Sequence, residues 1–108
     1  FISTDRRTRE KQRLLEIIKQ KSLLKGQFKL VSGAMSNYYL DMKPTTFDPE
    51  GVTLIGEIIC DMMQGDTDVD AIGGLELGAV PIVAAVCAQS FRSRPVNGFV
   101  VRKEKKGR

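Results

Sequence analysis

The sequence predicts an α/β fold built around a parallel strand–helix–strand unit. Two short apolar runs, 69–75 and 98–101, have the length of buried strands. A segment with helical spacing, at about 79–91, separates them and carries Pro81 in its first turn, where a missing N–H costs little. Parallel strands need such a crossover, and strands that are apolar on both faces are typical of sheets covered by helices.

The first element in chain order is an amphipathic helix from Arg6 to about Lys25, a segment rich in helix-forming residues. The apolar residues near one face of this helix are Leu14, Ile17, Ile18 and Leu24. We expect Gly26 to end the helix, because glycine commonly follows the last helical turn.

A hairpin and a second helix come next. Two β-prone runs, 28–31 and 38–42, are joined by a linker full of turn-forming residues, and a short connection at 43–46 follows them. The sequence Asp48-Pro49-Glu50 is typical of a helix start, with an N-cap, a proline at the first position and an acidic residue that complements the dipole. We expect this helix to end near Gly65.

The strand–helix–strand unit predicts where a ligand binds. Ligands of such units lie beyond the carboxyl ends of the strands, where the turn 76–78 and the basic run 102–106 leave the two strands. A backbone open to close approach at Gly78, a helix N-terminus and neighbouring cations predict an anion site. The alternative, that Gly78 only permits the turn and the cations are solvated, stays open.

The charge of the chain is concentrated in one short cluster. The five cations of this cluster are Arg102, Lys103, Lys105, Lys106 and Arg108, against the single anion Glu104. Setting these six residues aside leaves 12 of the 17 cationic and 12 of the 13 anionic residues, so the body of the chain is neutral. This distribution favours a small anionic ligand over a nucleic acid.

Several other classes of site are excluded. The chain has no histidine, and Cys60 and Cys87 lie in helical patterns, which favours reduced, buried thiols over a zinc or Cys–His site. The glycine turn fits neither the dinucleotide-binding nor the P-loop pattern. We expect a cytoplasmic protein without a membrane partner, because the sequence has neither a long apolar span nor a signal peptide. The start without Met and the end in a charged run indicate that both ends are cut.

Five segments resemble the orotate phosphoribosyltransferase family when they are taken in order. They are Gly26 to Gly33, Ser36 to Asp41, Asp48 to Gly51, Gly73 to Ile82 and Gly98 to Glu104. Each segment is weak alone, and the ordered spacing carries the specificity. The match extends from about Leu14 to Arg108.

The resemblance implies a type I phosphoribosyltransferase fold, in which helices flank a parallel sheet and a small N-terminal hood caps it. The chain would be the N-terminal half of one such domain, with the helix and hood at about 1–47. The first core helix and the strand–helix–strand unit, ending in the catalytic loop, would occupy about 48–108. The ribose-phosphate loop of the family would lie beyond Arg108, so we expect an incomplete fold with an uncovered apolar face, and a chain that is inactive alone.

The reaction that the resemblance implies is part of pyrimidine (UMP) biosynthesis. Orotate displaces pyrophosphate from 5-phosphoribosyl 1-pyrophosphate (PRPP) to give orotidine 5'-monophosphate. Mg²⁺ would be held mainly by the substrate pyrophosphate and by residues beyond this chain, and no residue present is expected to be a metal ligand. The partners would be the two substrates and a second copy of the protein, in a homodimer that shares the catalytic loop across its interface.

The resemblance also assigns site residues. Those expected to bind PRPP are Gly78, Arg102, Lys103, Lys106 and Arg108. Lys106 occupies the position of the loop lysine most important for rate, and we expect it to be catalytic. Those expected to contact orotate from the hood are Tyr38, Tyr39 and Leu40.

Three positions depart from the family pattern. Val31 and Leu77 stand where lysines are common, and Arg108 stands where a histidine is common. Lys29 and Lys43 are the candidates to replace the missing lysines. Two other functions stay open: a non-catalytic relative that senses a nucleotide, and a module that binds nucleic acid through the basic run.

Overall fold

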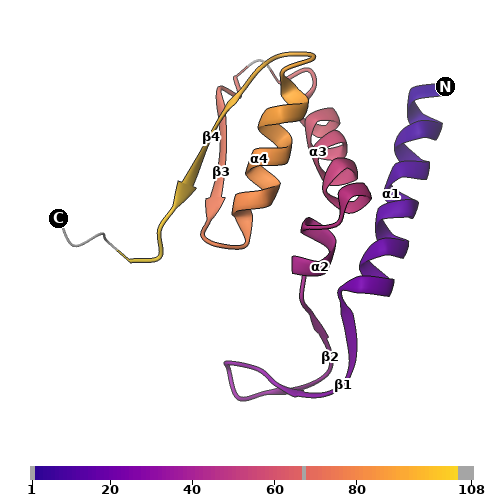
Figure 1. The fold of residues 1–108 in the computed structure, drawn as a ribbon, viewed down its shortest axis with the longest axis vertical. Coiled ribbons are helices and arrows are strands. Elements are labelled where there is room, and N and C mark those ends of the chain that lie inside the picture. Colours follow the sequence, from indigo (N-terminus) through magenta and orange to yellow (C-terminus); the bar gives the residue numbers. More distant parts are fainter. Residues whose placement is uncertain (1, 67, 105–108) are drawn as a thin grey trace.

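The computed structural model describes residues 2–66 and 68–104 and contains eight elements (Figure 1). In chain order they are α1 (Ile2–Lys21), β1 (Leu23–Lys29), β2 (Met35–Leu40), α2 (Lys43–Thr46), α3 (Pro49–Met63), β3 (Ala71–Leu75), α4 (Ala79–Ser90) and β4 (Asn97–Val101). β1 and β2 form an antiparallel hairpin, and β3 and β4 form a parallel pair. The predicted α/β class, hairpin and strand–helix–strand unit are therefore confirmed.

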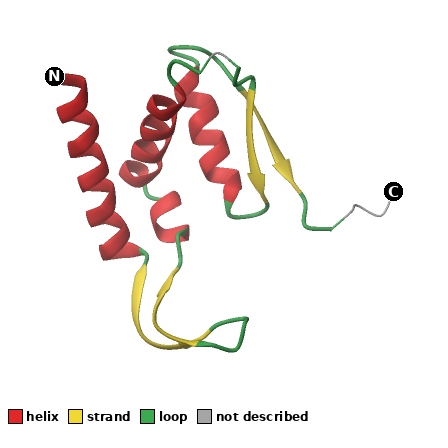
Figure 2. Ribbon diagram, turned by 180° about the vertical axis from the view of Figure 1, so that it is seen from behind, coloured by secondary structure: helices red, strands yellow, loops and turns green. Residues whose placement is uncertain are grey.

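The helices and the parallel pair lie side by side in layers (Figures 1 and 2). α1 packs on α3, α3 packs on α4, and α4 packs on both β3 and β4. The buried apolar side chains that join these layers are Ile17, Ile55, Ile58, Val83, Val86 and Val96. α1 therefore lies two layers away from the strands and contributes to the core by packing against α3.

Two glycines allow α4 to lie close to the parallel strands. A Cβ atom at Gly98 would lie 2.5 Å from Val83 Cγ1 of α4, and one at Gly74 would lie 2.5 Å from Ala79 Cβ. Neither space admits a side chain without movement of the helix. The register runs from Ala71↔Asn97 to Leu75↔Val101, so both strands end at the same edge.

The opposite face of the parallel pair is open in this chain. Leu75, Phe99 and Val101 are all exposed, and Phe99 lies over Gly73. Among the described elements, α4 packs on the parallel pair and covers its other face. The expectation of an uncovered apolar face is confirmed.

The N-terminal helix is shorter at its end than the sequence pattern predicts. It ends at Lys21, and Leu23, Leu24 and Lys25 pair in β1 with Leu40, Tyr39 and Tyr38. Gly26 lies inside β1 with a φ of 153°, where the register of the hairpin shifts, and does not end the helix. Cross-strand pairing competes for these residues and prevails over their helical preference.

The start of α3 is as predicted. The Asp48 carboxylate accepts a hydrogen bond from the Gly51 N–H at 2.7 Å and caps the helix. Lys21 Nζ, at the end of α1, donates to the other Asp48 oxygen at 2.5 Å. Lys21 and then the Gly51 N–H lower the pKa of Asp48. The helix ends at Met63, two residues before Gly65.

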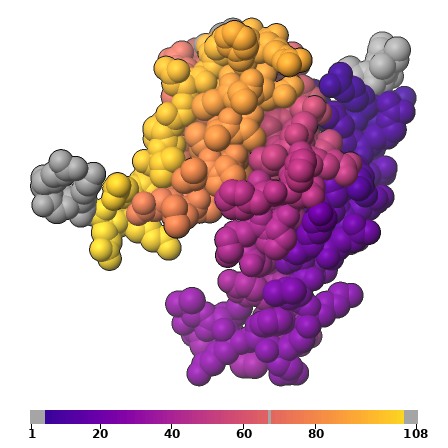
Figure 3. Space-filling model, viewed as in Figure 1, coloured from indigo at the N-terminus to yellow at the C-terminus, as the bar shows by residue number. Residues whose placement is uncertain are grey.

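The hairpin projects beyond the helices as a separate lobe and is joined to them at its base (Figure 3). There the hydroxyls of Ser22 and Thr45 are buried and 2.5 Å apart, and the Asp41 N–H donates to the Ser22 carbonyl at 3.0 Å. Thr45 belongs to α2, a short helix where only a connection was expected. A Cβ atom at Gly51 would lie 2.5 Å from the Thr45 carbonyl oxygen, so α2 also presses against α3.

Candidate functional site

The two parallel strands end at one edge, from which two functional candidates leave. The turn 76–78 follows β3 and opens α4, and residues 102–104 follow β4. Both strands point toward the end of the molecule that carries the hairpin (Figure 1). The structure thus brings the Gly78 turn, Arg102 and Lys103 to the same edge of the sheet, with the hood candidates on the same side of the molecule.

Glu76 links the turn to the start of the basic run. Its backbone N–H donates to the Val101 carbonyl at 2.9 Å, and its Oε1 accepts from the Lys103 N–H at 3.1 Å. This side-chain contact joins two segments that are 27 residues apart in the sequence. Arg102, Lys103 and Glu104 are otherwise exposed to solvent.

Gly78 adopts a conformation that any residue can take. Its φ and ψ are −56° and −34°, in the helical region, and a Cβ atom there would have no described atom within 4 Å. Neither the turn nor the packing requires a glycine at this position, in contrast with Gly74. This geometry disfavours the alternative that Gly78 only permits the turn. The same geometry leaves the Gly78 backbone accessible to a ligand.

A hollow of about 310 Å³ lies against this turn. Its lining comes from α2 and the residue after it, and from the turn and the start of α4: Lys43, Thr46, Phe47, Leu77, Gly78, Val80 and Pro81. Lys43 is therefore the substitute lysine that the structure brings to the turn, whereas Lys29 lies at the end of β1, outside this lining. Lys43 Nζ lies 3.1 Å from Asp41 Oδ1, and this contact is the largest cause of the lowered pKa of Asp41.

The three hood candidates lie on β2 and are exposed. The Tyr39 ring packs against Phe28 of β1, with ring centroids 5.8 Å apart and planes at 32°. Successive side chains of a strand point to opposite faces. Tyr39 therefore faces away from Tyr38 and Leu40, and one flat ligand can lie against Tyr39 or against the other two.

The remaining candidates divide into residues within and beyond the described part of the chain. Lys106 and Arg108 lie outside the described residues. Val31 and Leu77, the two positions where the resemblance led us to expect lysines, are both exposed, and Leu77 retains 80% of its accessible surface. Packing therefore gives no reason for an apolar side chain at either position.

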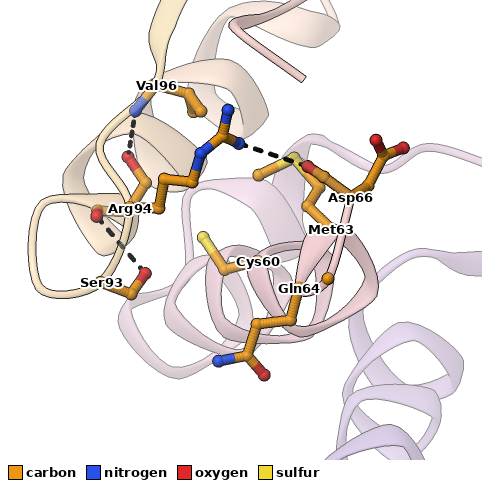
Figure 4. Close-up of a pocket in the computed structure, with 9 residues that line it drawn as sticks. Cys60, Met63, Gln64, Asp66, Ser93, Arg94 and Val96 are labelled. Atoms are coloured by element: carbon orange, nitrogen blue, oxygen red, sulfur yellow. Dashed lines mark hydrogen bonds between the residues drawn. The ribbon is translucent and has the colours of Figure 1, made fainter. Parts of the chain in front are cut away.

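A second hollow, of about 200 Å³, lies at the other end of the parallel strands (Figure 4). Arg94 donates to the carbonyls of Asp66 at 3.3 Å and Val69 at 2.7 Å, and the Val96 N–H donates to Ser90 Oγ at 3.0 Å. The two Arg94 bonds tie the loop before β3 to the loop before β4, and the Val96 bond ties that loop to the end of α4. We interpret this hollow as a structural joint, because its polar groups already bind one another.

Cys60 lines the same hollow, and neither it nor Cys87 forms a disulfide. Both thiols are half-buried, so the expectation of fully buried side chains is only partly met. Burial is the first cause of the raised pKa of Cys60, followed by the charge of Asp61. A raised pKa disfavours the reactive thiolate.

Two further searches are confined to the described residues. No group of three or more His, Cys, Asp or Glu side chains is placed to hold a metal ion in residues 2–66 and 68–104. No helix within the same ranges has the length and apolar character needed to cross a membrane.

Comparison with known proteins begins with sequence. No family model matches the chain. Over 95 residues, 87% of its length, the chain is 44% identical to an orotate phosphoribosyltransferase of Bradyrhizobium sp. (strain ORS 278) and covers 51% of that protein. It is 46% identical over 102 residues to the same enzyme of Aquifex aeolicus, of which it covers 55%. The chain spans about half the length of the curated relatives it matches.

Solved structures agree with these relatives. The orotate phosphoribosyltransferase of Mycobacterium tuberculosis H37Rv, in complex with Fe(III) dicitrate, matches 92% of this chain with a TM-score of 0.74 and 32% identity, and 55% of its own chain is covered. The same protein in complex with PRPP matches 92% of the chain with a TM-score of 0.71 and 31% identity, with 57% covered. A phosphoribosyltransferase from Corynebacterium diphtheriae matches 92%, with a TM-score of 0.74 and 34% identity, and is covered over 54%. The resemblance predicted from the ordered motifs is confirmed, and the chain shares the α/β fold of type I phosphoribosyltransferases over the matched part.

Proposed function

We propose that this chain is the N-terminal half of an orotate phosphoribosyltransferase, which transfers phosphoribosyl from PRPP to orotate. The observation that carries the proposal is the agreement between sequence and structure. The chain is 44% identical to a curated enzyme over 87% of its length, and the glycine turn and residues 102–104 follow strands that end at one sheet edge. The protein would act in pyrimidine biosynthesis, in the cytoplasm.

The turn and the basic run would bind the pyrophosphate end of PRPP. Negative charge builds on the departing pyrophosphate while the ribose becomes cationic, so cations fixed beforehand at this edge lower the barrier. Arg102 and Lys103 supply two of these charges, and the Gly78 backbone supplies room for close approach. Lys106 and Arg108, which lie outside the described residues, would also bind the pyrophosphate, with Lys106 contributing most to the rate.

The hood would hold orotate through β2. Tyr39 is the preferred contact, because its ring is already held in place by Phe28 and an aromatic face suits a flat ring. Tyr38 and Leu40 would form the alternative contact surface on the other side of the strand. A homodimer in which each basic run also serves the neighbouring copy completes the proposal.

The described residues do not by themselves build a metal site. Mg²⁺ therefore enters the proposal as an ion that accompanies the substrate and neutralises part of the pyrophosphate charge. Its protein ligands, where needed, would come from residues beyond this chain.

Orotate turnover in the natural polypeptide that contains this chain tests the proposal. Orotate consumption is followed by its ultraviolet absorbance, with PRPP and Mg²⁺ present. We expect turnover that collapses in Lys106→Ala and persists in Lys19→Ala, which removes an exposed lysine of α1. A folded protein that binds neither substrate and shows no turnover would reject the proposal and favour a nucleotide sensor.

A further inference from the structure

We propose that Glu76 is a positioning residue, whose carboxylate fixes the place at which Arg102 and Lys103 leave the sheet. The inference rests on the proposed function, in which these cations and the Gly78 turn bind the pyrophosphate end of PRPP. It concerns the one acidic side chain that the structure places between the turn and the start of the basic run.

The carboxylate takes over a backbone role in the parallel ladder. In parallel strands, a residue's N–H and C=O bind the two residues that flank its partner on the neighbouring strand. The register ends at Leu75↔Val101, so Arg102 is the next partner of Glu76. The Glu76 N–H binds Val101, as a ladder requires, and the bond that its C=O would accept from the Lys103 N–H is accepted by Oε1 instead.

The Glu76 carboxylate, in place of the backbone carbonyl, extends the hydrogen bonds between β3 and β4 by one residue. At this residue the backbone after β3 already turns away from β4. After Glu76 the chain must turn into α4, which begins at Ala79, so its carbonyl is no longer available to the neighbouring strand. The side chain reaches across and holds Lys103 in register. Among the hydrogen bonds between described residues, this contact is the one that anchors residues 102–104.

Electrostatics alone would disfavour an acidic residue here. A negative side chain at an edge that binds a phosphate group opposes the ligand, whereas a small neutral side chain would not. The contact with the Lys103 N–H gives the carboxylate a structural reason to be at this position. A hydrogen bond to an ionised acceptor is stronger than one between neutral groups, so the carboxylate is also the better anchor.

The position of the contact connects two parts of the proposed site. Glu76 lies two residues before Gly78 in the turn, and the bond holds the backbone between Arg102 and Glu104. The side chain of Glu76 thus adds to the backbone bond between Glu76 and Val101 and extends the fixed contact to Lys103. Removal of the Glu76 side chain would leave the Gly78 turn and the Arg102–Lys103 segment present, but the distance between them would no longer be fixed by the contact at Lys103.

Two substitutions separate the hydrogen bond from the charge. Glu76→Ala removes both, whereas Glu76→Gln keeps an acceptor oxygen and removes the charge. In the natural polypeptide that contains this chain, we expect Glu76→Ala to raise the KM for PRPP by roughly fivefold to tenfold, with a smaller change in kcat. Glu76→Gln should stay within about twofold of the unmodified protein, since its acceptor is retained.

A matched control lies at the other end of the same strand. Asp70 precedes β3 and has an exposed carboxylate that lies 3.8 Å from Arg94. Asp70→Ala changes the net charge by the same amount as Glu76→Ala without touching the carboxyl edge. It should leave the KM for PRPP unchanged.

Limited proteolysis gives a measurement that does not depend on activity. Trypsin cleaves after Arg102 and Lys103, and mass spectrometry reports the rate at these two bonds. We expect Glu76→Ala to be cleaved several times faster than the unmodified protein, because local opening controls cleavage. Asp70→Ala should be cleaved at the unmodified rate, and Glu76→Gln within about twofold of it, because its acceptor is retained although its charge is lost. Calorimetric titration with inorganic pyrophosphate should show weaker binding to Glu76→Ala than to the unmodified protein, Glu76→Gln and Asp70→Ala.

The outcomes distinguish this inference from the proposed function. Equal cleavage rates in Glu76→Ala and the unmodified protein would overturn the inference, as would an unchanged KM for PRPP. Absence of orotate turnover in the unmodified protein would reject the proposed function and the substrate part of this inference. The cleavage comparison would still decide whether Glu76 holds Lys103 in place.

Discussion

Gly74, near the end of β3, and Gly78, in the turn that follows it, should respond in opposite ways to alanine. At Gly78 the backbone is helical and a Cβ atom meets nothing within 4 Å, so Gly78→Ala should leave the free energy of unfolding unchanged or raise it by up to about 1 kcal/mol. At Gly74 a Cβ atom would lie 2.5 Å from Ala79 Cβ, a distance that forces α4 to shift. We expect Gly74→Ala to cost about 2 kcal/mol, as overpacked cores do.

Two assays on the natural polypeptide that contains this chain separate these effects. For ~200 residues, a loss of about 2 kcal/mol lowers the Tm by roughly 4–8 °C, a shift that circular dichroism resolves. Calorimetric titration with PRPP should give a Kd about tenfold weaker for Gly78→Ala, because the added methyl group prevents close approach of a phosphate to the backbone. A destabilised Gly78→Ala, or one that binds PRPP as tightly as the unmodified protein, would refute the role assigned to this glycine.

Three further results are expected. Lys43→Ala should raise the KM for PRPP by several fold, whereas Lys29→Ala should not, since Lys43 alone of the two lines the hollow at the turn; steady-state kinetics with both variants decides this. The hydrogen bond with Glu57 is the first cause of the raised pKa of Glu10, so folding favours the protonated form of this carboxyl. The contribution of the protonated carboxyl to the stability of the fold is therefore lost as the pH rises through the raised pKa. Glu10→Gln should therefore raise the Tm at pH 7 relative to the unmodified protein and leave it nearly equal at pH 4, and equal Tm differences at both pH values would contradict this. Cys60 should react with iodoacetamide at pH 8 more slowly than an unperturbed thiol, because burial raises its pKa, and alkylation at the rate of a free cysteine peptide would argue against it.

The elements that the sequence predicts best are those fixed by local chemistry. The start of α3 follows from Asp48 and Pro49, whose roles as N-cap and first helical residue depend on neighbours only a few positions away. The shared edge of the parallel strands follows from topology, because a crossover helix leaves little choice of strand direction. The end of α1 is harder to predict from the sequence, because Leu24 favours a helix locally but pairs with Tyr39 across the hairpin.

The candidate site is predictable in outline but not in its connections. Composition and spacing indicate the cations and the Gly78 turn. Sequence reasoning missed Glu76, which entered it only as the first residue of the turn 76–78. Its role depends on the register of β3 and β4, which the sequence does not specify to the residue. The signal that could have found it is its place one residue past the strand end, opposite the start of a basic run.

The contacts at the base of the hairpin set the orientation of the whole hairpin. β1 has seven residues, so at about 3.3 Å per residue the hairpin reaches roughly 23 Å from its base, and a tilt of ~5° there moves its tip by ~2 Å. The base is set by the buried contact between Ser22 and Thr45 and by the tight fit of Thr45 against Gly51. Substitutions at these small residues would therefore move the tip of the hairpin most and Tyr39 least, because Tyr39 pairs with Leu24 close to the base. The orientation of the hairpin can thus be altered from its base, without a change in any residue of its two strands.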